Sequence, residues 1–185
     1  YNYSGLIRRV VIESGVTDIG EAAFLDCFNL TEIVIPNTVT SIGRYAFYSC
    51  SGLTEIAIPD SVTVIGEAAF NSCGNLTEIV IPDGVTSIGE SAFSSCGKLA
   101  NVTLPSGITS IENATFVNCS ALSEIEIPAG VTEIGSNAFS WSGLTEITIP
   151  DSVTSIGSGA FVDCDGLTKV VLPKGLESIS EYLFD

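Results

Sequence analysis

The residues of this chain that could carry chemistry are carboxylates and thiols, because the 185-residue sequence contains no histidine. Histidine is the usual general base, so its absence excludes Ser–His and Cys–His nucleophilic catalysis. Acidic residues number 22 against 6 basic ones, which gives a formal net charge of −16. This charge repels nucleic-acid phosphates and anionic lipid surfaces, so we expect no nucleic-acid partner.

One position that recurs at an interval of 23 residues, shortened once to 22, is occupied mostly by glutamate. It reads Arg9, Glu32, Glu55, Glu78, Asn101, Glu124, Glu146 and Lys169. If these positions stack at a strand spacing of roughly 4.8 Å, each neighbouring pair of carboxylates repels by up to ~1 kcal/mol in a water-like dielectric. Two interpretations stay open. The glutamates are either a solvated face that discourages aggregation, or an acidic strip that binds a basic protein segment or Ca²⁺.

The position two residues further along each unit is apolar in the first half of the chain and polar in the second. It reads Val11, Val34, Ala57, Val80, Thr103, Glu126, Thr148 and Val171. A docked protein would bury the valines and be aligned by the neighbouring acids. The candidate partner-binding residues are therefore Glu32, Val34, Glu55, Glu78, Val80, Glu124, Glu126 and Glu146, together with the single tryptophan, Trp141.

Glu124 and Glu126 also suggest a remote alternative, a carbohydrate-active site. Two strand residues apart, their carboxylates are separated by about 6–7 Å, near the range that glycosidases use. The strip has no aromatic platform for a sugar and no insertion that would build a pocket. We therefore expect a protein that is not an enzyme and that binds no cofactor or metal.

Six cysteines stand at the same point of their units: Cys27, Cys50, Cys73, Cys96, Cys119 and Cys164. Equivalent side chains of stacked coils point the same way, whereas a disulfide needs convergent Cβ vectors and a thiolate metal site needs tetrahedral ligands. The spacing predicts buried free thiols that fill the core, with regulatory disulfides or a metal site as the alternatives.

All of these residues belong to one internal repeat. Complete units begin at residues 7, 30, 53, 76, 99, 122 and 144, a partial unit covers 167–185, and another partial unit covers 1–6, where Tyr1 takes the place of the repeat phenylalanine. Both ends cut the array at the same phase and neither has a polar capping sequence, which terminal repeats normally need. We expect one domain over residues 1–185 and a fragment of a longer protein.

The unit Leu76–Lys98 illustrates the predicted path of each repeat. Ile79 and Ile81 alternate with outward residues as in a short half-buried strand, and Pro82 ends it. Gly89 is expected to adopt a backbone conformation that other residues resist. A single helical turn is expected around Phe93. Stacking such units predicts a parallel solenoid with one continuous core.

The pattern L-T-E-I-x-I-P-x-x-V-T-x-I-G-x-x-A-F-x-x-C, which covers residues 7–185, resembles the BspA-type (Treponema-type) leucine-rich repeat. The resemblance implies an α/β repeat solenoid: a curved array with a parallel sheet on its concave face and short turns or single-turn helices opposite. It also implies an extracellular or cell-surface setting in bacteria or parasitic protists, where members are associated with adhesion to host proteins. The motif is structural, so it transfers no functional residues.

The expected function is thus a non-catalytic protein-binding or adhesion module whose partner is a host matrix protein or a basic segment. The alternative is a passive structural spacer that displays another domain. No apolar run has membrane-spanning length, so no direct membrane insertion of this segment is expected.

Two units depart from the pattern. Glu112 replaces the repeat glycine and Thr115 replaces the alanine before Phe116, so the fifth unit should be locally looser or differently turned. The sixth unit is one residue short near Trp141 and has Ser142 in the cysteine position. We expect Trp141 either to cover the gap left by the shortened turn or to act as an exposed binding anchor.

Overall fold

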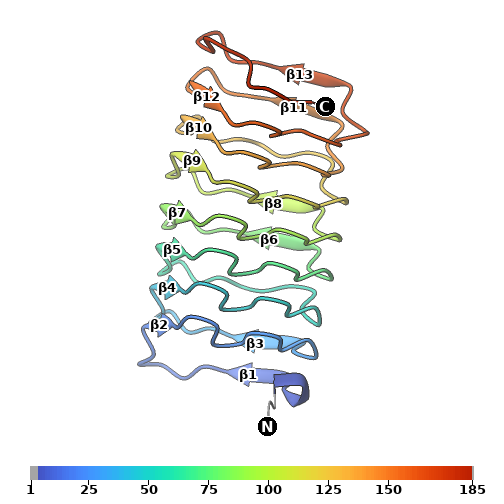
Figure 1. Ribbon diagram of the computed structural model, residues 1–185. Coiled ribbons are helices and arrows are strands. Elements are labelled where there is room, and N and C mark those ends of the chain that lie inside the picture. Colours follow the sequence, from blue (N-terminus) through green and yellow to red (C-terminus); the bar gives the residue numbers. More distant parts are fainter. Residues whose placement is uncertain (1–3, 185) are drawn as a thin grey trace.

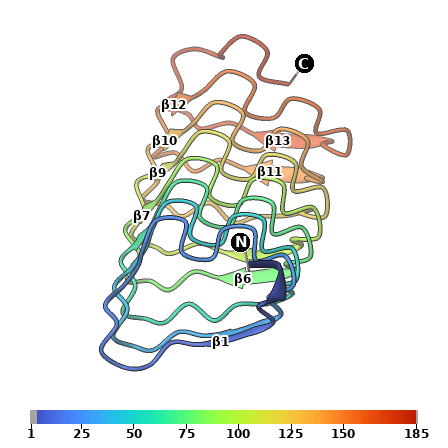
Figure 2. The same cartoon turned by 60° about the horizontal axis from the view of Figure 1, so that its bottom comes forward.

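The structure is a computed structural model that describes residues 4–184. The chain winds into a stack of coils, and each coil follows nearly the same path as the one before it (Figures 1 and 2). Tyr1 and the rest of residues 1–3 lie outside the described residues, so the described part of the first partial unit is the short 3₁₀ helix η1 (Ser4–Leu6).

Two series of short parallel strands run along the stack, one on each side of Figure 1. The longer strands are β1 (Arg9–Val11), β3 (Glu32–Val34), β6 (Glu78–Val80), β8 (Asn101–Thr103), β11 (Glu146–Thr148) and β13 (Lys169–Val171). The two-residue strands are β2 (Asp18–Ile19), β4 (Ser41–Ile42), β5 (Val64–Ile65), β7 (Ser87–Ile88), β9 (Ser110–Ile111), β10 (Glu133–Ile134) and β12 (Ser155–Ile156).

The register of the strands repeats the unit length. Arg9 lies beside Glu32, Glu78 beside Asn101, and Glu146 beside Lys169, and each pair is 23 residues apart. The row of equivalent residues from Arg9 to Lys169, which contains most of the predicted glutamates, is called the file below. The apolar residue of each strand points inward, as Ile79 does with 1% of its surface exposed. Equivalent side chains of successive units therefore lie above one another, as the 23-residue repeat predicts.

The single-turn helices expected opposite the longer strands are absent from the described residues, where these segments are turns. Two residues per segment have positive φ, for example Ser91 at 57° and Ser95 at 59°. Alternate N–H groups bond within the turn and to the next coil, so that Phe93 donates to the Thr115 carbonyl and Ala92 to Gly89. A helix needs negative φ throughout, so the fold is a β-solenoid with almost no helix.

The glycine that precedes each turn segment was expected to have an unusual backbone conformation, and this expectation is wrong. The glycines with positive φ among the described residues are Gly15 and Gly159, which lie elsewhere in the unit. The repeat glycine is needed for close approach instead. A Cβ on Gly89 would lie 2.4 Å from the backbone nitrogen of Glu67 in the preceding coil.

The core fills the space between the two walls of the coil. Inward leucines, isoleucines, valines, cysteines and phenylalanines form one continuous cluster from Ile19 to Leu183. The repeat phenylalanines stack face to face along it, with centroids 5.2 Å apart at Phe24–Phe47 and 5.9 Å apart at Phe161–Phe184. Because the core occupies the interior, only outward side chains remain to meet a partner.

Candidate interaction face

The strand face consists of the outward side chains of the longer strands and of the equivalent residues 55–57 and 124–126. Its six predicted glutamates are all exposed: Glu32, Glu55, Glu78, Glu124, Glu126 and Glu146. Val34 and Val80 are 44% and 63% exposed beside them. The structure thus brings eight of the nine predicted partner-binding residues onto one surface.

Ion pairs neutralise both ends of this acidic file. Arg9 Nε lies 2.9 Å from Glu32 Oε1, and Lys169 Nζ lies 3.3 Å from Glu146 Oε2. Exposed pairs of this kind add little stability, with a median near 0–1 kcal/mol, but they do compensate charge locally. Within residues 4–184, four carboxylates of the strand face have neither an ion pair nor a hydrogen bond: Glu55, Glu78 and Glu124 of the file, and Glu126 beside it.

Strand pairing on this face is interrupted at every third unit. The pairs are β1–β3, β6–β8 and β11–β13, and residues 55–57 and 124–126 form no strand. In the described chain, the backbone N–H groups of residues 55–58 and 124–127 donate to no backbone carbonyl. The ladder is therefore open on both sides of each of these two segments.

The interruptions follow the charges. Where strands pair, the file sets Arg9 beside Glu32, Glu78 beside Asn101, or Glu146 beside Lys169, so that no two carboxylates are neighbours. Where they do not pair, Glu55 would stand between two glutamates, and Glu124 would stand between the neutral Asn101 and Glu146. Like charges directly opposite each other destabilise a strand pair, which agrees with the open ladder on both sides of Glu55 and between Glu124 and Glu146, but not with the open side that faces Asn101.

Each open segment lies under a shallow depression of the strand face. One depression, of about 590 Å³, is lined by residues that include Glu55, Glu78 and Val80. The other, of about 700 Å³, is lined by residues that include Glu124 and Glu126. No aromatic ring lines either depression, so neither has the stacking platform expected of a sugar site.

Trp141 does not belong to this surface. It lies in the turn segment, whose phenylalanine points into the core from the wall opposite the strand, and its side chain is 56% exposed. Its indole N–H donates to an Asp163 carboxylate oxygen in the next coil. Trp141 therefore cannot contact one flat partner together with the strand-face glutamates.

Glycine and serine close the shortened turn of the sixth unit on its inner side. A Cβ on Gly143 would lie 2.3 Å from the Ser120 carbonyl oxygen, so only glycine allows this approach. Ser142 occupies the cysteine position, is buried, and lies 3.3 Å from Cys164 Sγ. Trp141 lies at this turn with 56% of its surface exposed, so both interpretations, a cover over the shortened turn and a binding anchor, stay predictions.

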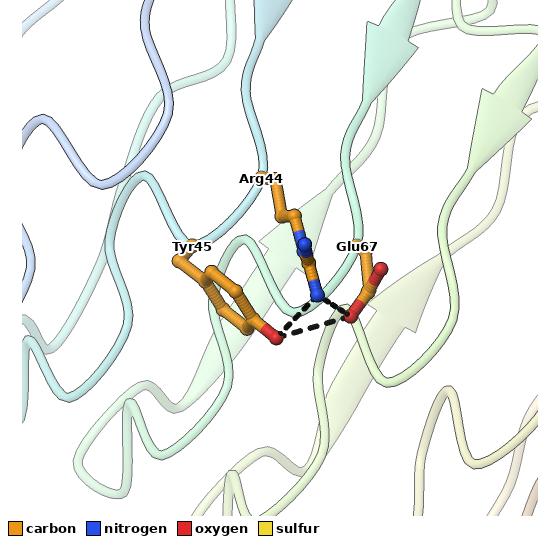
Figure 3. Close-up of polar contacts among 3 residues, drawn as sticks. All are labelled: Arg44, Tyr45 and Glu67. Carbon is orange, nitrogen blue, oxygen red and sulfur yellow. Dashed lines mark hydrogen bonds and ion pairs between the residues drawn. The ribbon is translucent and has the colours of Figure 1, made fainter.

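The turn side carries a cluster that the sequence interpretation did not single out (Figure 3). Arg44 Nη2 donates to Tyr45 Oη at 2.8 Å and to Glu67 Oε1 at 2.9 Å, and its guanidinium lies 4.5 Å from the Tyr45 ring centroid. The hydrogen bond to Glu67 is the main cause that raises the pKa of Arg44. The sequence could have revealed this cluster, because Arg44 is a cation that lies 23 residues after Glu21 and 23 residues before Glu67.

The six cysteines are free and buried, as the equal spacing predicts. Burial raises the pKa of the Cys73 and Cys119 thiols well above the ordinary value, and raises the pKa of Cys50 and Cys96 to about 12. In the described residues, no group of three or more acidic, cysteine or histidine side chains is arranged to hold a metal ion. No helix in the same residues is long and apolar enough to cross a membrane.

Comparison with known proteins agrees with this geometry. Residues 1–122 and 86–185 match the BspA type leucine rich repeat region, in 6 copies. No curated protein matches the sequence.

Three solved structures are similar to the chain along nearly its whole length. They are a leucine-rich repeat protein from Bacteroides ovatus (28% identity, TM-score 0.70), a leucine-rich repeat protein from T. pallidum (31%, 0.67) and a leucine-rich cell surface protein from Faecalibacterium prausnitzii (28%, 0.66). The alignments cover 98%, 94% and 96% of this chain, and 64%, 72% and 72% of the respective proteins. The repeat motif, the stacked coils and the similar solved structures all indicate the same family. The chain belongs to the BspA-type leucine-rich repeat family and has the leucine-rich repeat fold.

Proposed function

We propose that this chain is a non-catalytic protein-binding module of a cell-surface or secreted protein, and that it binds through the strand face, the concave side in the family's architecture. The observation that carries the proposal is the set of four uncompensated carboxylates beside exposed valines. Charged groups of one sign steer a partner of opposite sign and align it, while apolar contacts supply burial. The partner is therefore a basic segment of a protein, such as a host matrix protein.

The cell-surface setting is supported by the similarity to the Faecalibacterium prausnitzii cell surface protein. An adhesin must present its binding residues on a scaffold that keeps their spacing. The stacked coils, joined by backbone hydrogen bonds from one coil to the next, supply such a scaffold. Adhesion is the function that best fits a rigid, acidic and partly apolar face.

The test compares two triple variants that change charge equally. Glu55→Lys, Glu78→Lys and Glu124→Lys together invert the uncompensated part of the strand face. Glu21→Lys, Glu90→Lys and Glu133→Lys make the same change at exposed positions elsewhere. Biosensor binding to a panel of purified basic matrix proteins is measured at low and moderate salt.

We expect the strand-face variant to lose at least about tenfold in affinity, the effect of ~1.4 kcal/mol, and the control variant to bind as the parent does. Salt should weaken parental binding. Equal losses in both variants would contradict the strand face as the site. A parent that binds none of the proteins would support the passive spacer, which the continuous core and phenylalanine stack also suit.

A further inference from the structure

The uncompensated carboxylates of the strand face are not evenly distributed. Glu55 and Glu78 are neighbours in the file, and Glu124 and Glu126 lie on a single segment. Between them stands Asn101, the one neutral residue of the file, on β8. The face therefore offers two acidic pairs separated by a neutral strand.

Each acidic pair coincides with its own depression and its own open segment of the ladder. The depression around Glu55 and Glu78 and the one around Glu124 and Glu126 share no lining residue. Glu32 and Glu146 line them as well, but their charges are compensated by Arg9 and Lys169. Unbalanced negative charge is thus concentrated at two places and is low between them.

The distance between the two pairs follows from the number of coils. The first pair is centred midway between the coils of Glu55 and Glu78, and the second pair lies on the coil of Glu124. The distance between these two centres is about two and a half coils, or about 12 Å at the spacing of adjacent strands. An extended peptide advances about 3.3 Å per residue. Two cationic groups about four residues apart would therefore reach both pairs at once.

The apolar residues make the two ends of this surface different. Val34 and Val80 are exposed beside the first pair, whereas Thr103 and Thr148 occupy the same position beside the second. A partner with an apolar side chain near one of its cationic groups would bind in one direction only.

We propose that the strand face binds a bipartite basic segment of a partner protein, with two cationic clusters about four residues apart in extended chain, one over each acidic pair. This inference rests on the proposed function and adds to it the spacing and direction of the ligand. Linking two weak contacts makes the second one intramolecular, so matched spacing raises affinity without any new contact.

Fluorescence anisotropy with labelled peptides tests the spacing. One peptide carries two Lys-Arg pairs joined by Gly-Ser, which places the cluster centres four residues apart. A charge-matched peptide joins the same pairs directly, and a third carries one pair only. The protein is used as the parent, as Glu55→Gln with Glu78→Gln, as Glu124→Gln with Glu126→Gln, and as the control Glu21→Gln with Glu90→Gln.

We expect the Gly-Ser peptide to bind the parent at least about tenfold more tightly than the directly joined peptide, within the range that effective concentration allows. Either strand-face double variant should abolish this preference, and the control variant should keep it. Equal affinity of the two charge-matched peptides would overturn the bipartite site. If the basic matrix proteins still bind in that case, the proposed function stands without it. If neither peptides nor proteins bind, both proposals fail.

Discussion

Each buried cysteine from the second coil onward donates its thiol hydrogen to a phenylalanine carbonyl in the preceding coil. Cys73 Sγ lies 3.2 Å from the Phe47 carbonyl oxygen, and Cys96 Sγ lies 3.2 Å from that of Phe70. The thiol thus fills the core and satisfies a backbone acceptor at once. This role needs the protonated thiol, since a thiolate cannot donate.

The buried thiols should make folding stability fall in alkaline solution. Burial raises the pKa of Cys96 from 9.0 to about 12, so between these values the unfolded chain loses a proton that the folded chain keeps. Each such thiol then lowers the free energy of unfolding by about 1.4 kcal/mol per pH unit. Urea unfolding with reductant at pH 7.5 and pH 10 should show a smaller loss in Cys96→Ala than in the parent.

Tyrosine and lysine titrate equally in both proteins, so the difference between parent and variant isolates the thiol. Cys96→Ala should be less stable than the parent at pH 7.5, because it loses a buried side chain and a hydrogen bond. Its pH dependence is the informative quantity. Parallel pH profiles for the two proteins would contradict the account.

Among single residues, sequence analysis placed the inward side chains correctly and misjudged the repeat glycine. Periodicity located Ile79, Phe93 and Cys96 in the core, since burial repeats with the unit. It left two interpretations of Trp141 open, because a one-residue deletion does not reveal which neighbour closes the turn. It also explained the repeat glycine by an unusual backbone conformation. Glycine is required both where φ is positive and where two coils approach closely, and a single sequence does not distinguish these two causes.

At the scale of the elements, the second strand series is broken where the repeat glycine is missing. β7 and β9 belong to different sheets, and the break lies next to Glu112. The N–H of Gly89 donates to the preceding coil at Ile65, whereas Glu112 makes no equivalent bond in the part of the chain described. A Cβ at this position keeps the two coils apart, which agrees with the looser fifth unit that the sequence predicted.

Glu112→Gly should close this break. Without a Cβ the fifth coil can approach the fourth, so the amides of residue 112 and Thr109 should gain hydrogen bonds and exchange more slowly with solvent deuterium. Glu112→Ala is the matched control, because it removes the carboxylate and keeps the Cβ. Similar exchange in the two variants would show that the charge of Glu112, and not its Cβ, separates the coils.

The turn segments show why fold class was predicted better than element type. Their apolar positions indicated inward side chains, and a single helical turn satisfies that pattern as well as an irregular turn does. The difference lies in alternate N–H groups, which bond to the next coil at residues such as Thr115 and Val117. Such bonds exist only in the stack and cannot be recognised within one unit. The open ladder at Glu55 and Glu124 was missed for a different reason: the repeat pattern predicts the same strand in every unit, although the repulsion between neighbouring glutamates could be read from the sequence.

At the scale of the whole molecule, stability is transmitted from coil to coil. Phe93 is fully buried, and its ring centroid lies 5.4 Å from that of Phe70 and 5.7 Å from that of Phe116. In a solenoid each unit contacts only its neighbours, so the stability is close to a sum of units and interfaces. A defect in a central coil therefore weakens two interfaces.

Phe93→Ala should lower the free energy of unfolding by about 3–5 kcal/mol and should favour separate unfolding of the two halves. Urea unfolding followed by circular dichroism should then show a broadened or two-step transition. Phe28→Ala is the control, since its side chain is 52% exposed and its loss should cost about 1 kcal/mol or less. A single sharp transition with a loss no larger than that of Phe28→Ala would contradict this account.

Because equivalent residues recur every 23 positions, the distances between sites along the strand face are whole multiples of the spacing between coils. Removing residues 99–121 as one whole unit would join Lys98 to Leu122 and set Glu78 beside Glu124, and it would leave the sequence of every other unit unchanged. The two acidic pairs would then be closer by one step of about 4.8 Å. Gain or loss of a repeat can therefore retune the length of ligand that the protein recognises in discrete increments, while the chemistry of each contact stays the same.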